Sequence, residues 1–356
     1  MHPTRPTDRP VSGTTASTGT TGTTGTTGTT VQIGSVEEAE SAPPETSAER
    51  PVAVVIGGSR GLGLLIAREL LTRGHRVVVA ARDVEEIEDA ARTLSGWGPV
   101  SGERCDVRDR HDVGELVGRV EHVVGPIEVL VTVAGVIQTA PVESLVLHEF
   151  EDAMDTMAWG PIHAALTVLP HMRRRGHGRI GTVTSIGGMV SPPHLLPYAT
   201  AKFAAVGFSD GLAAALSGTG VTATTIVPGL MRTGGHEHAR FGGDAPAEYA
   251  WFAPAASLPL VSVDADRAAR RIVDAVLAGR PMVVLTPLAW LGIRVRGLAP
   301  ATTTRVLGLV GRLLPDAPGR VGARTAEGHE AARRLGSSLV DRLTTLGERA
   351  ARRNLG

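Results

Sequence analysis

The stretch VAVVIGGSRGLG, residues 52–63 of this 356-residue chain, decides how the rest of the sequence is interpreted. Its first five residues are all apolar, a run short enough for a strand that is buried on both faces. A glycine-rich turn comes next, and an amphipathic helical pattern then extends from about Leu62 to Arg73. Residues 75–80 form a second apolar run. A strand, a glycine turn, a helix and a second strand in this order predict a βαβ unit.

The glycine turn of such a unit is suited to a diphosphate. Glycines let the backbone approach the ligand closely, and the N-terminus of the following helix favours negative charge. We therefore expect the turn to hold the diphosphate of a dinucleotide. The residues of the turn that are expected to contact this cofactor are Gly57, Ser59, Arg60, Gly61, Leu62 and Gly63.

The residue after the second strand indicates which dinucleotide is bound. An acid at this place accepts the ribose hydroxyls of NAD(H), whereas a base suits the 2′-phosphate of NADP(H). This chain has Arg82 there, and Arg60 inside the turn adds a second cation. We therefore predict a preference for NADP(H). Asp83 follows one position later, so NAD(H) stays open as the alternative.

Strands and helices alternate along the chain up to about residue 285. Further strands are predicted to end near 104–107 and to cover 127–133, 179–185, 221–227 and 282–285, and helices to cover 84–94, 109–124, 142–157, 161–175, 198–216 and 264–278. The stretch 234–263 contains many Gly and Pro residues and is predicted to be irregular. The alternation predicts an α/β domain over residues 51–286, a doubly wound parallel sheet (Rossmann fold) with helices on both faces.

Ser185, Tyr198 and Lys202 form a candidate catalytic group. Tyr198 and Lys202 are four residues apart, so on a helix both side chains leave the same face. Ser185 ends an apolar run thirteen residues before Tyr198. Lys202 is the only lysine beside 35 arginines, and Tyr198 is one of two tyrosines. A hydroxyl, a phenol and an ammonium arranged in this way can polarise and protonate a carbonyl oxygen.

Over residues 52–285 the chain resembles the short-chain dehydrogenase/reductase family, in its ordinary rather than its extended type. The glycine turn, the Ser–Tyr–Lys spacing, the Ala134-Gly135 pair and the P-G-x-x-x-T motif at 228–233 carry the resemblance. The resemblance implies that Ser185, Tyr198 and Lys202 are catalytic, and that Tyr198 and Lys202 also contact the cofactor. It further implies cofactor contacts from Asp106 (at the adenine), Ala134, Gly135, Pro228, Gly229 and Thr233.

Several positions depart from the family pattern. Ile56 stands where the glycine motif usually begins with Thr, and Thr132-Val133 replace two Asn before Ala134. Met157 stands where the family often has a helix Asn that positions a water linking the catalytic lysine to solvent. Because Met cannot hold this water, a nucleotide-binding regulator or scaffold with weak or lost catalysis stays open as an alternative to an enzyme.

The motifs together predict an NADP(H)-dependent oxidoreductase that moves hydride between the nicotinamide and an alcohol or ketone substrate. Tyr198 would be the general acid in reduction, or the base in oxidation, with its pKa lowered by the ammonium of Lys202 and by the oxidised nicotinamide. Ser185 would hydrogen-bond the substrate oxygen. The predicted walls of the substrate site, residues 189–196 and 233–260, suggest an apolar small molecule. Their aromatic side chains are Phe241, Tyr249, Trp251 and Phe252.

The overall composition excludes several other classes of protein. Acids and bases balance at 36 each, so net charge does not favour nucleic acid as a partner. Cys105 is the single cysteine, and the chain has neither a secretory signal nor a long apolar run, so we expect a cytoplasmic protein. His194, His236 and His238 have no Cys or acid at ligand spacing and are expected to be solvated, with no metal site.

The two ends of the chain differ from the domain between them. Residues 1–50 carry a Thr-Thr-Gly repeat and an acidic, Pro-containing piece, and are expected to be a disordered tail. Residues 287–356 carry 12 Arg and 5 acids, a net charge of +7, and begin with two predicted amphipathic helices separated by Pro300. Residues 324–353 predict one charged helix. This extension suits a cap on the substrate cleft or a homo-oligomer contact, or alternatively a peripheral contact with a membrane.

Overall fold

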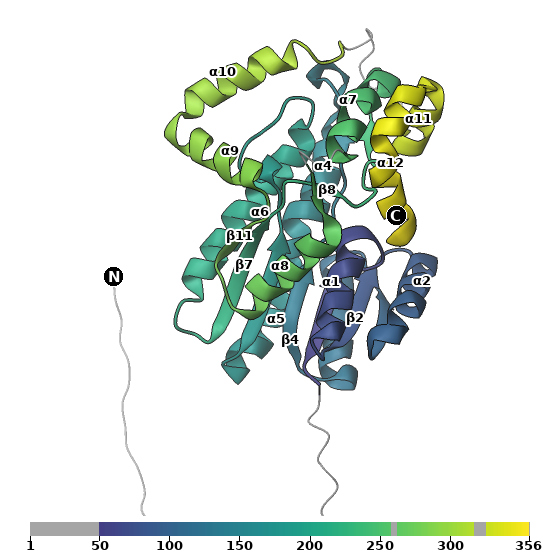
Figure 1. Ribbon diagram of the computed structural model, residues 1–356. Helices are drawn as coiled ribbons and strands as arrows, with labels where there is room; N and C mark the ends of the chain where they lie inside the picture. Colours follow the sequence, from purple (N-terminus) through teal and green to yellow (C-terminus); the bar gives the residue numbers. More distant parts are fainter. Residues whose placement is uncertain (1–49, 258–261, 317–324, 356) are drawn as a thin grey trace, which may run out of the picture. The chain divides into compact units, whose positions relative to one another are not determined.

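A seven-stranded parallel sheet runs through the domain in the strand order β11-β7-β6-β4-β1-β2-β3 (Figure 1). This computed structural model describes residues 50–257, 262–316 and 325–355. The strands are β1 (Val52–Ile56), β2 (Arg76–Ala81), β3 (Val100–Arg104), β4 (Ile127–Thr132), β6 (Gly178–Val183), β7 (Val221–Val227) and β11 (Met282–Val284). The strand order reverses between β1 and β4, and in open α/β sheets ligands bind in the crevice at such a reversal.

Strand β1 lies in the middle of the sheet because all of its side chains are apolar. Val54 pairs with Val78 of β2 on one side and with Leu130 of β4 on the other. Successive side chains of a strand point to opposite faces. Ala53 and Val55 therefore join one hydrophobic core and Val54 the other. The continuous apolar run of the sequence thus fills two cores at once.

Helices cover both faces of this sheet. One face packs against α1 (Gly61–Thr72), α2 (Val84–Leu94) and α8 (Ala265–Leu277), and the other against α3 (Arg110–Arg119), α5 (Gly160–Arg175) and α6 (Leu196–Ala215). Short 3₁₀ or π turns extend or connect these elements, namely η1 (Ser95–Trp97), η2 (Val120–Val124), η3 (Val142–Ser144) and η5 (Ile186–Gly188). The predicted doubly wound α/β fold is confirmed.

Two helices that the sequence predicts as separate are joined in the structure. Helix α4 (Leu147–Met154) continues through the π-helical turn η4 (Asp155–Trp159) directly into α5. The helical pattern was expected from residue 142, but α4 begins at Leu147. The reason is that the carboxylate of Glu149 accepts a hydrogen bond from the backbone N–H of Val146, at 2.9 Å, and thereby caps the helix there.

The stretch 234–263 is not irregular as expected, because it contains helix α7 (Ala245–Ser257). Apolar and small residues occupy every face of this helix, and Pro254 lies inside it. The sequence therefore shows no alternation of apolar and polar residues with a helical period. Tyr249, Phe252 and Ala253 are buried. Short strands complete the region around α7, namely β5 (Gln138–Thr139), β8 (Leu230–Arg232), β9 (Arg240–Phe241), β10 (Ser262–Asp264) and β12 (Ala326–Glu327).

The C-terminal region is helical, as predicted. Helices α9 (Pro287–Leu298) and α10 (Pro300–Gly311) meet at Pro300. The single charged helix expected after residue 324 is instead two helices, α11 (Gly328–Leu335) and α12 (Ser338–Arg353), which Gly336 separates with a left-handed φ of 59°. Ala331, Ala332 and Leu335 of α11 join the core around α7. The tail predicted at the N-terminus lies, apart from Arg50, outside the described residues.

Candidate active site

A cavity of about 850 Å³ lies at the carboxyl ends of the central strands. Ile56, Ala81, Val133, Val183 and Pro228 line it, each at or just beyond the end of one strand. Its volume falls in the upper part of the range for sites of small molecules and cofactors. The sheet topology therefore brings residues from distant parts of the sequence to one edge.

Every residue that the sequence predicts for catalysis or cofactor contact lines this cavity, except Gly61. They are Gly57, Ser59, Arg60, Leu62, Gly63, Arg82, Asp106, Ala134, Gly135, Ser185, Tyr198, Lys202, Pro228, Gly229 and Thr233.

The glycine turn is shaped by close backbone contacts. Gly57 has a φ of 84°, and a Cβ on it would lie 2.5 Å from the backbone nitrogen of Ala134. A Cβ on Gly63 would lie 1.9 Å from the carbonyl oxygen of Gly57. Both distances are far below van der Waals contact, so neither position accepts a side chain without displacement of the backbone. The bare turn and the helix N-terminus that follows fit the diphosphate of a dinucleotide.

The C-terminal end of the described chain contacts this turn. The backbone N–H of Gly61 donates a hydrogen bond to the carbonyl oxygen of Asn354, at 2.8 Å. The sequence contains no indication of this contact, because the two residues are almost three hundred positions apart.

The charged residues beyond the turn are partly paired with one another. Glu86 accepts hydrogen bonds from Arg60 at 3.0 Å and from Ser59 at 2.9 Å. Arg82 is exposed and lines the cavity. Asp83 caps helix α2 by accepting from the backbone N–H of Glu86 at 3.0 Å. Glu86 was not among the residues expected at the site, although it lies on the first turn of α2 beside Arg82.

Asp106 carries an ion pair of its own. Its carboxylate accepts hydrogen bonds from the guanidinium of Arg108, the shortest at 2.7 Å. These hydrogen bonds hold the pKa of Asp106 below its usual value. The carboxylate is therefore ionised at neutral pH, at the end of the cavity where Arg82 also lies.

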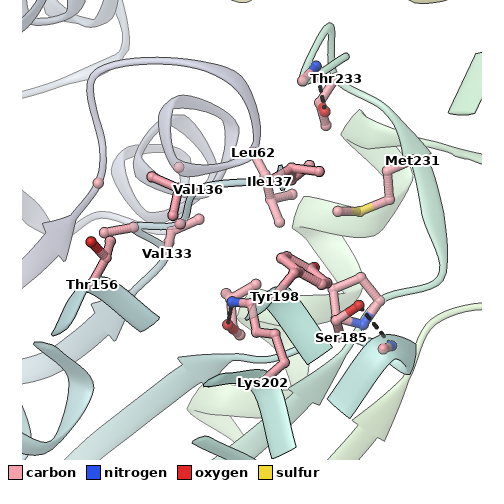
Figure 2. A pocket seen from close by; sticks show the side chains of 18 of the residues that line it. Leu62, Val133, Val136, Ile137, Thr156, Ser185, Tyr198, Lys202, Met231 and Thr233 are labelled. Carbon is pink, nitrogen blue, oxygen red and sulfur yellow. Dashed lines mark hydrogen bonds between the residues drawn. The ribbon is translucent and has the colours of Figure 1, made fainter. Parts of the chain in front are cut away.

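Ser185, Tyr198 and Lys202 gather at the other end of the cavity (Figure 2). A Cβ built on Gly187 would lie 3.0 Å from Cε1 of Tyr198 and 3.4 Å from Oγ of Ser185, so both side chains border the same small space. Gly187 also donates its backbone N–H to Oγ of Ser185 at 3.0 Å, which orients the hydroxyl. Nζ of Lys202 lies 5.9 Å from the centre of the Tyr198 ring and donates to the carbonyl oxygen of Val183 at 2.8 Å.

Burial shifts the pKa values of Tyr198 and Lys202 in the protein without cofactor. Burial raises the pKa of Tyr198 above its usual value, and hydrogen bonding with Ser185 offsets only part of this rise. The expected lowering by Lys202 is therefore wrong for the protein without cofactor. Burial also lowers the pKa of the Lys202 ammonium to about 8. The phenol is thus protonated at neutral pH and able to donate a proton.

Residues 51–240 match the family described as short chain dehydrogenase. The chain belongs to this family. A putative ketoacyl reductase of Streptomyces coelicolor is 35% identical over 51% of this chain and 71% of its own length. The 2-(R)-hydroxypropyl-CoM dehydrogenase of Xanthobacter autotrophicus is 32% identical over 51% of this chain and 75% of its own length.

Solved structures resemble this short-chain dehydrogenase as well. A single-residue variant of an actinorhodin polyketide ketoreductase, crystallised with NADPH, is 29% identical with a TM-score of 0.60, and the match covers 68% of this chain and 97% of that one. A short-chain dehydrogenase from Streptomyces avermitilis is 26% identical with a TM-score of 0.63, over 74% and 98% of the two chains. The family match ends at residue 240, so helices α7 to α12 lie beyond it.

Met157, which replaces the usual Asn of the family pattern in this short-chain dehydrogenase, lies in the core next to the catalytic group. The Met157 side chain is fully buried and packs with Ala201 and with Tyr198, beneath the catalytic group. Its sulfur lies 3.4 Å from the Cβ position of Gly135. The neighbouring residue on the π turn, Thr156, lines the cavity (Figure 2). Sequence reasoning missed Thr156, because nothing in the chain indicates a π turn at this place.

The predicted substrate walls of this short-chain dehydrogenase contribute only some of their residues to the cavity. Val190, Leu195, Trp251 and Phe252 line it, from the loop before α6 and from α7. Residues 258–260 lie outside the described residues. Two of the predicted aromatic residues, Phe241 and Tyr249, are buried in the core behind the wall and do not line the cavity.

The sequence predicts three solvated histidines, but His194 and His236 are largely shielded from solvent. Nδ1 of His194 pairs with Glu248 at 2.7 Å, and this fully buried carboxylate also accepts from the indole of Trp251 at 2.8 Å. His236 is buried and lines the cavity, and burial lowers its pKa to about 4. His238 is exposed. Within residues 50–257, 262–316 and 325–355, no three His, Cys, Asp or Glu side chains converge on a possible metal position. The hydrogen bond from Trp251 to Glu248 holds this cavity-wall residue in place, a role of Glu248 that the sequence did not indicate.

Proposed function

We propose that this short-chain dehydrogenase is an NADPH-dependent reductase of an apolar ketone. One observation carries the proposal. The glycine turn and the Ser185, Tyr198 and Lys202 group line one continuous cavity. A dinucleotide whose diphosphate lies on the turn would have its nicotinamide end near the phenol. When bound, NADPH would supply a hydride to the carbonyl carbon.

The preference for NADPH rests on the cations at the adenosine end. Arg82 lines the cavity and is exposed, so its guanidinium is free to approach a 2′-phosphate. Arg60 is nearby but shared with Glu86. Asp106 would contact the adenine and Thr233 the nicotinamide, and both residues line the cavity. A solved relative crystallised with NADPH supports this preference by analogy.

The direction of reaction is proposed from the acidity of Tyr198. Because burial raises its pKa, the phenol keeps its proton at neutral pH and can give it to the oxygen of a ketone as hydride arrives. Ser185 Oγ would hydrogen-bond the same oxygen and fix its direction. Lys202 lies beneath the ring as an ammonium, and its charge stabilises the phenolate that remains after proton transfer.

The substrate class is proposed from the wall of the cavity. Val190, Leu195, Trp251 and Phe252 present apolar surface next to the catalytic group. Transfer of an apolar ketone from water to such a wall is favourable in proportion to the area buried. Two relatives carry ketoacyl reductase in their names, one from Streptomyces coelicolor and one from Streptomyces violaceoruber, which agrees with a carbonyl substrate.

The test uses the purified full chain with NADPH and a panel of ketones of increasing apolar size. Tyr198→Phe removes the proton donor and is expected to lower turnover by about 10²–10⁴ while NADPH binding stays nearly unchanged. The matched control is Tyr249→Phe, the same change at the only other tyrosine, which lies outside the cavity. Wild-type turnover by Tyr198→Phe would show that the assignment is wrong.

The alternative is a nucleotide-binding regulator with lost catalysis. Met157 in the usual Asn position favours it, because the water of the proton relay loses its anchor. NADPH binding without turnover of any ketone or alcohol by the wild-type protein would support this alternative.

A further inference from the structure

The outer faces of α9 and α10 are apolar and uncovered by any described part of the chain. Their exposed apolar side chains, 43% to 88% accessible, recur at three- and four-residue intervals and so form one stripe on each helix. Figure 1 shows the two helices as a bent arm at one edge of the domain. We call the following residues the apolar arm. They are Leu288, Trp290, Leu291, Val295 and Leu298 of α9, and Val306, Leu309, Val310 and Leu313 in or just after α10.

Helix α9 packs on the domain with its inner face, and α10 contacts the domain near its C-terminal end. Ala289 is buried. The Cβ position of Gly292 lies 3.8 Å from Ile186 and 3.9 Å from Val190, two residues that line the cavity. The Cβ position of Gly311, in α10, lies 3.4 Å from Pro193. The arm is therefore attached to the outside of the substrate wall, and its apolar stripes face away from it.

The charge around the stripes has one sign. Residues 287–315 contain four arginines and no Asp or Glu. The arginines are Arg294, Arg296, Arg305 and Arg312. Arg294 lies 4.3 Å over the ring of Trp290, which places a cation and an indole together at the edge of the stripe. A second copy docked face to face would bring two sets of four arginines together without any acid on either arm, which like-charge repulsion opposes. The complementary surface is apolar in its interior and anionic at its rim.

We propose that the apolar arm lies in the surface of an anionic lipid bilayer, with both helices parallel to the membrane plane. The apolar side chains would enter the boundary between headgroups and acyl chains, and the arginines would contact lipid phosphates. Among the described residues no helix has the length and hydrophobicity needed to cross a bilayer, so the contact is peripheral. Trp290 suits this depth, because indoles favour the membrane–water interface.

A consequence follows for the substrate, and this step rests on the proposed ketone reductase activity. Because α9 packs against Ile186 and Val190 of the cavity wall, a bound arm would hold that wall at the bilayer surface. The substrate class that fits is a lipophilic ketone that partitions into the membrane. Its local concentration would rise there, whereas a small water-soluble ketone would gain nothing.

The test is co-sedimentation of the full chain with phosphatidylcholine vesicles that contain about a third phosphatidylserine, without NADPH or substrate, so that it does not depend on the enzyme activity. Leu291→Glu with Leu309→Glu puts two acids into the exposed stripes. The matched control, Val123→Glu with Leu147→Glu, makes the same change at two exposed apolar positions on other elements. Arg305→Gln with Arg312→Gln is expected to lower vesicle affinity about fivefold for each arginine.

The proposal holds if the wild type and the control sediment with these vesicles and the stripe variant does not, while the stripe variant keeps the wild-type unfolding temperature. Failure of the wild type to sediment, or equal sedimentation of the stripe variant, overturns it. A concentration-dependent dimer that the stripe variant abolishes would show that the arm binds a second copy, and this also overturns it. Vesicle binding by a protein that lacks reductase activity would leave the membrane contact standing and remove only the substrate step.

Discussion

The buried ammonium of Lys202 gives a prediction in which stability and activity move in opposite directions. Burial lowers its pKa from 10.5 to about 8, so the folded protein loses roughly 3 kcal/mol of stability while the group is charged. Lys202→Met keeps a side chain of similar size and removes this cost. It also takes one donor from the carbonyl oxygen of Val183, which costs about 1–3 kcal/mol. At about pH 7 we expect the free energy of unfolding of Lys202→Met to exceed that of the wild type by roughly 0–2 kcal/mol. Turnover should be strongly reduced.

The pH dependence isolates the contribution of the charge. Because the folded pKa of Lys202 lies below the unfolded one, the unfolded chain binds more protons between the two values, and wild-type stability rises with pH through this window. The variant lacks this rise, so its advantage should shrink by roughly 2 kcal/mol between about pH 7 and about pH 9.5. Urea unfolding of both proteins at the two pH values measures the difference, and groups common to both cancel. Parallel stability curves, or a variant several kcal/mol less stable at neutral pH, would refute a buried charge at this position.

Three further predictions concern the cofactor end of the cavity. Gly63→Ala should abolish NADPH binding in equilibrium titration and lower the unfolding temperature, because the added Cβ would lie 1.9 Å from a turn carbonyl. Glu86→Gln should tighten NADPH binding about two- to fivefold and change NADH binding less. The reason is that Arg60 loses its half-exposed ion pair and becomes available to a 2′-phosphate. Equal effects on both cofactors would contradict this. A chain that ends just before Asn354 should bind NADPH more tightly, as measured by calorimetry. The reason is that the N–H of Gly61 no longer donates to the Asn354 carbonyl and is available to the diphosphate. Unchanged affinity would show that this contact does not compete with the diphosphate.

The sequence alone predicted the sheet and the position of the site for steric reasons. A run of five apolar residues suits a strand that is buried on both faces of a parallel sheet, and β1 is such a strand. The glycines at 57 and 63 stand where any Cβ would overlap backbone atoms. Tyr198 and Lys202 share a helix face because their spacing matches one helical turn. Requirements of this kind depend on neighbours in the sequence and are therefore visible in it.

Helix α7 and His194 show where such reasoning fails. A helix with apolar residues on all its faces and an internal proline has no periodicity. Its contacts with α11 and α12 and with Phe241 of β9 stabilise it. His194 looks like a solvated loop residue in the sequence, yet Glu248, which lies 54 positions further along, hydrogen-bonds its Nδ1 and leaves its side chain only partly exposed. Both outcomes depend on which residues the fold brings together.

The amino-acid sequence thus determined the fold class, and it predicted the glycine turn and the three side chains of the candidate active site, because each depends on local sterics and spacing. The tertiary structure alone decided how these groups are tuned. Burial sets a raised pKa at Tyr198 and a lowered one at Lys202, Glu86 shares Arg60, and the carbonyl of a residue near the C-terminus reaches the glycine turn. Solvent exclusion and long-range pairing are properties of the packed chain, and no single stretch of sequence contains them.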